Sequence, residues 1–154
     1  MRRTTEISAG LVAFRRAKAL EVLLAHPGGP YWAKKDDGAW TIPKGLAEPE
    51  ADLLATARRE FTEETNLPAE GEFHALDPVK QKSGKIVHAW AFAADFDLGP
   101  FASNFFEIEW PPKSGGRQRF PEIDRIAYFA LPIAMQKILL YQQPLLRQLE
   151  KRVG

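Results

Sequence analysis

The sequence predicts a mixed α/β domain of the α+β type rather than a regular βαβ array. Short apolar runs rich in β-branched and aromatic residues occur on both sides of one long segment with helical spacing of its apolar residues. Further helical segments close the chain. A length of 154 residues suits one domain with one hydrophobic core, so we expect a single domain over residues 1–154.

The first two strands are expected at Ser8–Phe14 and Glu21–His26, which are apolar and partly β-branched. The polar segment 15–18 lies between them, so the two strands form a predicted hairpin. Pro27–Pro30 contains two prolines and two glycines and breaks the chain. An irregular loop over 31–38 and a short extended segment over 39–43 are expected to follow.

The best helix candidate spans Pro49–Thr65. Pro49 fits an early helical position, where its missing N–H costs nothing. Asn66 can adopt the left-handed conformation that ends a helix, and Pro68 prevents its continuation. The apolar residues at helical spacing are Leu53, Leu54, Ala57 and Phe61.

The second half of the chain contains strands and then helices. Lys85–Phe96 has apolar residues on both faces, which favours a central strand. The prolines and glycines within 111–116 mark a loop, and Arg125–Ala130 is a late strand. Helices are predicted at Pro132–Leu140 and Gln143–Arg152.

Composition excludes several classes of protein. The formal net charge is +1, so no electrostatic excess points to DNA, RNA or an acidic membrane as a partner. Because the chain has no cysteine, disulfides, zinc–thiolate sites and thiol nucleophiles are absent. No apolar run reaches signal-peptide or membrane-spanning length. We therefore expect a cytoplasmic protein with no membrane partner.

Three glutamates near the end of the predicted helix form the most informative pattern. Glu60, Glu63 and Glu64 stand at positions i, i+3 and i+4 and share one side of the helix. At about 100° per residue, Glu60 and Glu64 fall within about 20° of Leu53, on the line that begins as core. An ordinary amphipathic helix keeps such positions apolar.

Carboxylates that face the body of a protein need compensation, because desolvation and mutual repulsion both penalise their charge. A divalent cation provides it, and a set of carboxylate oxygens favours Mg²⁺ or Mn²⁺. Since Mg²⁺ commonly binds substrate phosphates, a phosphate ester or anhydride is the natural substrate. A solvated acidic patch, with Arg59 paired to Glu63, is the alternative reading, and helical geometry alone leaves both open.

The segment Gly45–Leu67, GLAEPEADLLATARREFTEETNL, resembles the Nudix box, G-x5-E-x7-R-E-U-x-E-E-x-G-U, where U is a bulky apolar residue. Gly45, Arg59, Glu60, Phe61, Glu63, Glu64 and Leu67 all stand at the spacing of this motif. The resemblance to the Nudix, or MutT-like, hydrolases implies a mixed β-sheet sandwiched between helices. The segments EWPPKSGGRQRF and FPEIDRIAYF are similar to a bacterial subgroup of predicted nucleotide pyrophosphohydrolases.

Two positions depart from the motif. Ala51 occupies the place of the first motif glutamate, which in the family supports the motif arginine, so Arg59 needs another partner such as Glu63 or a neighbour of Ala51. Asn66 stands where glycine is expected. Asparagine tolerates positive φ better than most residues, so we expect this second change to be nearly neutral.

The resemblance implies that Glu60, Glu63 and Glu64 coordinate Mg²⁺, or Mn²⁺, together with the main-chain carbonyl of Lys44. Water activated by the metal and a carboxylate base would then attack phosphorus and cut a pyrophosphate bond. Glu60 is one candidate for the base. Three carboxylates outside the box are the other candidates, although each is individually more typical of a surface acid: Glu107, Glu109 and Glu122.

The substrate implied is a small nucleoside-diphosphate compound. Nucleoside triphosphates, dinucleoside polyphosphates, nucleotide sugars and inositol pyrophosphates are all compatible with the motif. The lead PKGLAEP is similar to that of dinucleoside-polyphosphate hydrolases, which makes this class the first choice. Residues expected to contact substrate phosphates or stack on a base are Lys44, Lys34, Trp32 and Trp40.

A different class of function also fits the sequence. A Nudix-fold module that binds or senses a nucleotide, with weak or no hydrolysis, would be consistent with Ala51 in place of the first motif glutamate. The three intact box glutamates favour the enzyme instead.

Overall fold

The computed structural model describes residues 5–99 and 104–154. Its first half contains strands β1 (Ile7–Arg16), β2 (Leu20–Pro27) and β3 (Lys44–Leu46), helix α1 (Leu53–Thr65), and strands β4 (His74–Ala75), β5 (Val79–Lys80) and β6 (Ile86–Ala93). The second half contains β7 (Phe105–Glu109), β8 (Arg117–Pro121), β9 (Ile123–Ala130), α2 (Leu131–Lys137), the 3-10 turn η1 (Leu140–Gln142) and α3 (Gln143–Val153). Among the described helices, none is long and apolar enough to cross a membrane.

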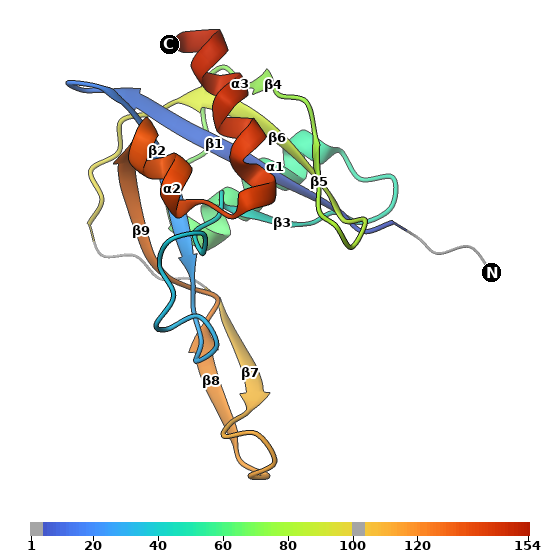
Figure 1. The fold of residues 1–154 in the computed structure, drawn as a ribbon. Helices are drawn as coiled ribbons and strands as arrows, with labels where there is room; N and C mark the ends of the chain where they lie inside the picture. The colour runs from blue at the N-terminus through green and yellow to red at the C-terminus, as the bar shows by residue number, and fades with distance from the viewer. Residues whose placement is uncertain (1–4, 100–103) are drawn as a thin grey trace.

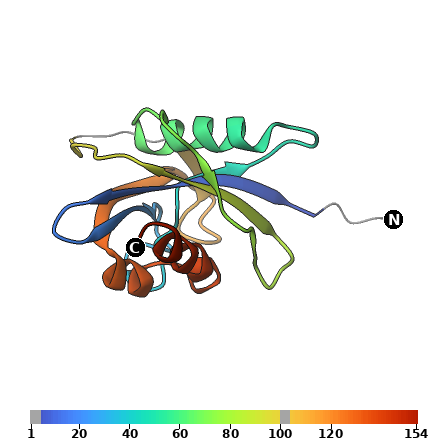
Figure 2. The ribbon, with the colours of Figure 1, turned by 90° about the horizontal axis from the view of Figure 1, so that it is seen from above.

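Seven of the described strands form a mixed sheet with helices on both sides. Strand order along the main path is β4-β6-β1-β2-β9, with β3 beside β1 and β5 beside β6. β1 and β6 run parallel, whereas β1 is antiparallel to both β2 and β3. Helix α1 covers one face, and α2 and α3 cover the other (Figure 2). The predicted α+β class with a mixed sheet between helices is confirmed.

Two hydrophobic cores lie on the two faces of the sheet. On one face, Leu11 and Leu23 pack with Ala57 and Phe61 of α1. On the other face, Val12 and Leu24 pack with leucines of α2 and α3. The alternation of β-strand side chains explains why neighbouring residues of β1 enter different cores. The segment predicted as a central strand, now β6, contributes side chains to both cores, as the apolar residues on its two faces predict.

Helix α1 begins later than the sequence pattern suggests. The predicted start at Pro49 is wrong, because Glu50 has a positive φ of 65° and the helix begins at Leu53. The carboxylate of Asp52 accepts a hydrogen bond from the Ala55 N–H at 3.1 Å, as a good N-cap does. At the other end Asn66 is left-handed, with φ 61°, and confirms the predicted cap.

A two-stranded arm formed by β7 and β8 projects from the body (Figure 1). The sequence predicts the loop of this arm, but not the strands on either side. The arm joins the body at Glu122, between β8 and β9. A Cβ on Gly28 would lie 1.9 Å from the carbonyl oxygen of Pro121, so only glycine allows the end of β2 to approach the arm so closely. The Gly28 N–H donates to the Glu122 carbonyl at 2.9 Å.

Candidate active site

Helix α1 presents its glutamates at two levels of burial. Glu60 and Glu64 are partly buried, on the side of the helix that faces the sheet. Glu63 points outward, with 43% of its side chain exposed against 19% for Glu60. The helical geometry predicted from the sequence therefore places two carboxylates against the body and a third at its edge.

Strand β3 lies directly against these carboxylates. A Cβ on Gly45 would lie 2.1 Å from the carboxyl carbon of Glu60, so the contact requires glycine at this position. The neighbouring Lys44 N–H donates to the Glu64 Oε2 at 3.4 Å. Because β3 pairs with β1 through Gly10 and Lys44, the sheet itself fixes the backbone on which the glutamates rest.

Burial has a large effect on Glu64. It raises the pKa of the Glu64 carboxyl from 4.5 to about 8; Lys44 partly offsets this, while Glu60 and Glu122 raise it further. A carboxyl in this environment holds its proton near neutrality unless additional positive charge is supplied. At neutral pH we therefore expect the Glu64 carboxyl to bind either a cation or a proton.

Glu122 belongs to the same group of carboxylates. Partial desolvation is the main cause that raises the pKa of the Glu122 carboxyl, and the negative charges of Glu60 and Glu63 raise it further. The other two candidate bases lie on the arm and have local partners. Glu107 accepts from the Arg117 Nε at 2.8 Å, and Glu109 accepts from the Lys113 N–H at 2.7 Å. The fold thus brings Glu122, rather than Glu107 or Glu109, into the electrostatic field of the box glutamates.

Arg59 pairs with the glutamates of its own helix. Its guanidinium lies 3.2 Å from Glu60 Oε1 and 3.7 Å from Glu63 Oε1. Ala51 lines a hollow of about 550 Å³ with Ile7, Leu46 and other residues. Arg59 therefore contacts Glu63, one of the partners expected from the sequence, and also Glu60.

The donor chemistry fits Mg²⁺ or Mn²⁺, because the available groups are carboxylate and carbonyl oxygens. Over residues 5–99 and 104–154, no set of three or more His, Cys, Asp or Glu side chains is arranged to hold a metal ion by itself. Mg²⁺ does not need such a set. It usually keeps several waters and binds through one or two carboxylates and substrate phosphates. Glu60 and Glu64 beside Lys44 match that requirement.

The predicted substrate-contacting residues differ in accessibility. Lys34 is exposed, and Trp32 is partly buried with the Lys35 Nζ 5.1 Å from its ring centroid. Trp40 is only 4% exposed. Its Nε1–H donates to Asp36 at 2.8 Å, and its ring packs edge-to-face against Phe129. Trp40 thus has no free face for a base, and its ring belongs to the hydrophobic core.

His26, for which the sequence pattern predicts no role, contacts two separate segments of the chain. The ring is fully buried, its Nδ1 lies 2.8 Å from Asp124 Oδ1, and its Nε2 donates to the Lys35 carbonyl at 2.7 Å. This bridge ties the loop 31–38 to the strand that begins after Glu122. A histidine that ends an apolar strand was the only available signal, and it does not reveal a partner 98 residues away.

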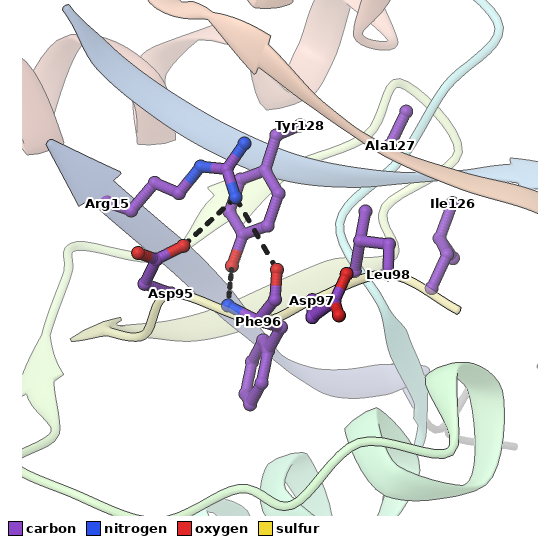
Figure 3. Close-up of a pocket in the computed structure, with 8 residues that line it drawn as sticks. All are labelled: Arg15, Asp95, Phe96, Asp97, Leu98, Ile126, Ala127 and Tyr128. Atoms are coloured by element: carbon purple, nitrogen blue, oxygen red, sulfur yellow. Dashed lines mark hydrogen bonds and ion pairs between the residues drawn. The ribbon is translucent and has the colours of Figure 1, made fainter. Parts of the chain in front are cut away.

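A separate cavity of about 570 Å³ lies beside Arg15 and Tyr128 (Figure 3). The Arg15 guanidinium lies 3.7 Å from the Tyr128 ring centroid and pairs with Asp95 at 3.0 Å. The Tyr128 hydroxyl donates to the Ala94 carbonyl and accepts from the Phe96 N–H. These mutual contacts attach the segment that follows β6 to β9, so we interpret this cluster as structural.

Comparison with known proteins gives a consistent picture of the fold. The sequence pattern of the NUDIX domain matches residues 4–114. No curated protein matches the chain.

Several solved structures resemble it over nearly its whole length. A Caenorhabditis elegans Ap4A hydrolase in a binary complex is 23% identical, with a TM-score of 0.65 and coverage of 95% of this chain and 97% of the other. The NUDIX domain of Shewanella oneidensis NrtR, complexed with ADP ribose, is 16% identical, with a TM-score of 0.68 and coverage of 99% and 91%. A NUDIX hydrolase from Nitrosomonas europaea is 21% identical, with a TM-score of 0.61 and coverage of 99% and 74%.

Proposed function

This chain belongs to the Nudix family, and on that premise we propose that it is a Mg²⁺-dependent hydrolase that cuts a pyrophosphate bond in a nucleoside-diphosphate compound. One observation carries the proposal. Glu60 and Glu64 face the sheet beside Lys44, and burial raises the pKa of Glu64 to about 8. Carboxylates are retained in such a place at a cost to stability, which a bound cation offsets. We further propose that the C-terminal strand and helices belong to the same single domain, over residues 1–154.

Glu60, Glu63 and Glu64, with the main-chain carbonyl of Lys44, would hold Mg²⁺, with Mn²⁺ as the alternative ion. When bound, the ion would neutralise phosphate charge and make water a stronger nucleophile. Arg59 keeps Glu60 and Glu63 in place through its contacts at 3.2 and 3.7 Å. The Lys44 side chain adds positive charge beside Glu64, where the phosphates of a substrate would lie.

Glu122 is the proposed general base. It stands outside the helix, and its pKa is raised by partial desolvation and by the charges of Glu60 and Glu63, so we place it at the edge of the site, where it would act on water without being one of the box glutamates. Its raised pKa makes it a stronger proton acceptor than an ordinary glutamate once it is ionised. In this scheme Glu122 accepts the proton of the water that attacks phosphorus.

A small nucleotide is the proposed substrate, and dinucleoside polyphosphates are the first class to test. The PKGLAEP lead supports this choice. The structural neighbours include an Ap4A hydrolase and a domain complexed with ADP ribose, and Ap4A and ADP ribose both contain a pyrophosphate linkage. A net charge of +1 favours a small molecule over a nucleic acid, and we propose a cytoplasmic location.

The test is hydrolysis of diadenosine tetraphosphate, ADP-ribose and ATP with Mg²⁺ or Mn²⁺, with identification of the products. We expect metal-dependent turnover by the wild type and a loss of roughly 10²-fold or more in Glu64→Gln. Glu150→Gln, which changes an exposed glutamate of α3, is the matched control and should keep full activity. Equal turnover by the wild type and Glu64→Gln would refute the mechanism. Tight nucleotide binding without turnover would support the sensor reading instead.

A further inference from the structure

The arm is anchored to the body through one of its two sides. Phe106 and Phe120 are cross-strand partners on that side, with ring centroids 6.0 Å apart. A Cβ on Gly29 would lie 2.8 Å from the Phe106 ring, and Tyr31 packs edge-to-face on Trp110 at 5.3 Å. A two-stranded ribbon is marginally stable alone, so these contacts hold the arm in a defined orientation.

The opposite side of the arm carries an exposed aromatic ring. Side chains alternate along a strand, so Phe105 and Arg119 point away from the anchored side. Phe105 is 54% exposed, and the Arg119 guanidinium lies 4.7 Å from its ring centroid. Arg117 lies two residues before Arg119 on β8 and is instead paired with Glu107, with its Nε 2.8 Å from the Glu107 Oε1. Phe105 and Arg119, which we call the platform, therefore form a stacked aromatic–cation pair open to solvent.

The platform stands next to Glu122. Phe105 pairs with Pro121, the residue before Glu122, and the Glu122 N–H donates to the Asn104 carbonyl at 2.8 Å. Cross-strand partners are about 5 Å apart and successive Cα atoms 3.8 Å apart, so the Phe105 and Glu122 Cα atoms lie within about 10 Å of each other. A nucleotide whose phosphates contact the carboxylates could thus extend its nucleoside to Phe105.

We propose that Phe105 and Arg119 bind the nucleobase end of the substrate, with the base stacked on the Phe105 ring and the guanidinium of Arg119 close to base and phosphate. Base–aromatic stacking tolerates different bases, and a stacked arginine contributes through both its plane and its charge. The inference rests on the proposed function for the position of the phosphates. Packing does not explain why Phe105 is exposed, whereas stacking of a base on its ring does.

The experiment compares two ligands with the same phosphate chain, diadenosine tetraphosphate and inorganic tetraphosphate. Their binding is measured by calorimetry with Mg²⁺, in a Glu64→Gln chain so that the ligand is not consumed. Phe105→Ala should weaken binding of the dinucleotide roughly tenfold and leave tetraphosphate unchanged, since stacking involves only the base. Arg119→Ala should weaken the binding of both ligands, and it should weaken that of the dinucleotide more strongly. Phe105→Trp should retain dinucleotide binding.

The matched controls are Leu140→Ala and Arg147→Ala, which remove an exposed apolar and an exposed cationic side chain from η1 and α3; neither should change either affinity. Equal effects of Phe105→Ala on both ligands, no effect on either, or no binding of the dinucleotide to the parent chain would overturn the proposal. Turnover by the wild type decides the proposed function separately: a chain that binds through the platform but cuts nothing would refute hydrolysis and keep this inference.

Discussion

Replacing Glu64 by glutamine should make the metal-free protein more stable at alkaline pH, while it lowers activity roughly 10²-fold or more. The unfolded chain releases the Glu64 proton near pH 4.5, whereas the folded chain retains it until about pH 8. Between these values the folded state binds one proton more than the unfolded state, so this group lowers stability as the pH rises. Above pH 8 its full cost is present.

The size of the effect follows from the two pKa values. Each pH unit between 4.5 and about 8 costs about 1.4 kcal/mol, so ionised Glu64 destabilises the fold by roughly 4–5 kcal/mol at most. Glutamine has nearly the same shape and carries no charge. Its amide oxygen can still accept the Lys44 N–H that Glu64 accepts at 3.4 Å. We therefore expect similar stability of both proteins at pH 5 and a gain of several kcal/mol for Glu64→Gln at pH 9.

The assay is urea denaturation with EDTA at pH 5, 7 and 9, with Glu150→Gln as the surface control. Other groups titrate in the same range, but they are common to both proteins, so the difference between wild type and Glu64→Gln isolates this carboxyl. Added Mg²⁺ should reduce the gap at pH 9, because the metal stabilises the ionised wild type. A difference that does not change with pH would refute the assignment of Glu64 as a buried carboxyl in need of a cation.

Three other substitutions address the rest of the site. Glu122→Gln should lower kcat by roughly 10²-fold or more if this group is the base, whereas Glu107→Gln should leave steady-state kinetics unchanged; similar losses in both would contradict the assignment. Gly45→Ala places a Cβ 2.1 Å from a box glutamate, so kcat should fall roughly 100-fold and urea denaturation should show a loss of about 1–3 kcal/mol. Ala51→Glu should restore a partner to Arg59 and raise activity or metal affinity roughly tenfold, as measured by Mg²⁺ titration of the rate; no gain would mean that the existing pairs of Arg59 suffice.

Local patterns predicted most of the elements that carry the candidate site. The helix, its left-handed end at Asn66 and the shared side of Glu60 and Glu64 follow from spacings of three and four residues. The start of the helix was misplaced by four residues, because Pro49 and Asp52 both fit a helix N-terminus and only Asp52 caps it. The sequence does not predict the two strands of the arm, because charged residues and prolines obscure the short alternation of apolar and polar residues in them.

The sequence alone predicts the carboxylates that we propose as metal ligands, since Gly45 and the three helical glutamates all lie in one short segment of the chain. Tertiary packing decides what surrounds those carboxylates. It brings Glu122 to them from 58 residues beyond Glu64, buries Trp40 and leaves Phe105 exposed. Local propensity acts over a helical turn, whereas these three outcomes depend on strand pairing across distant segments, and only the folded sheet determines which side chains then meet.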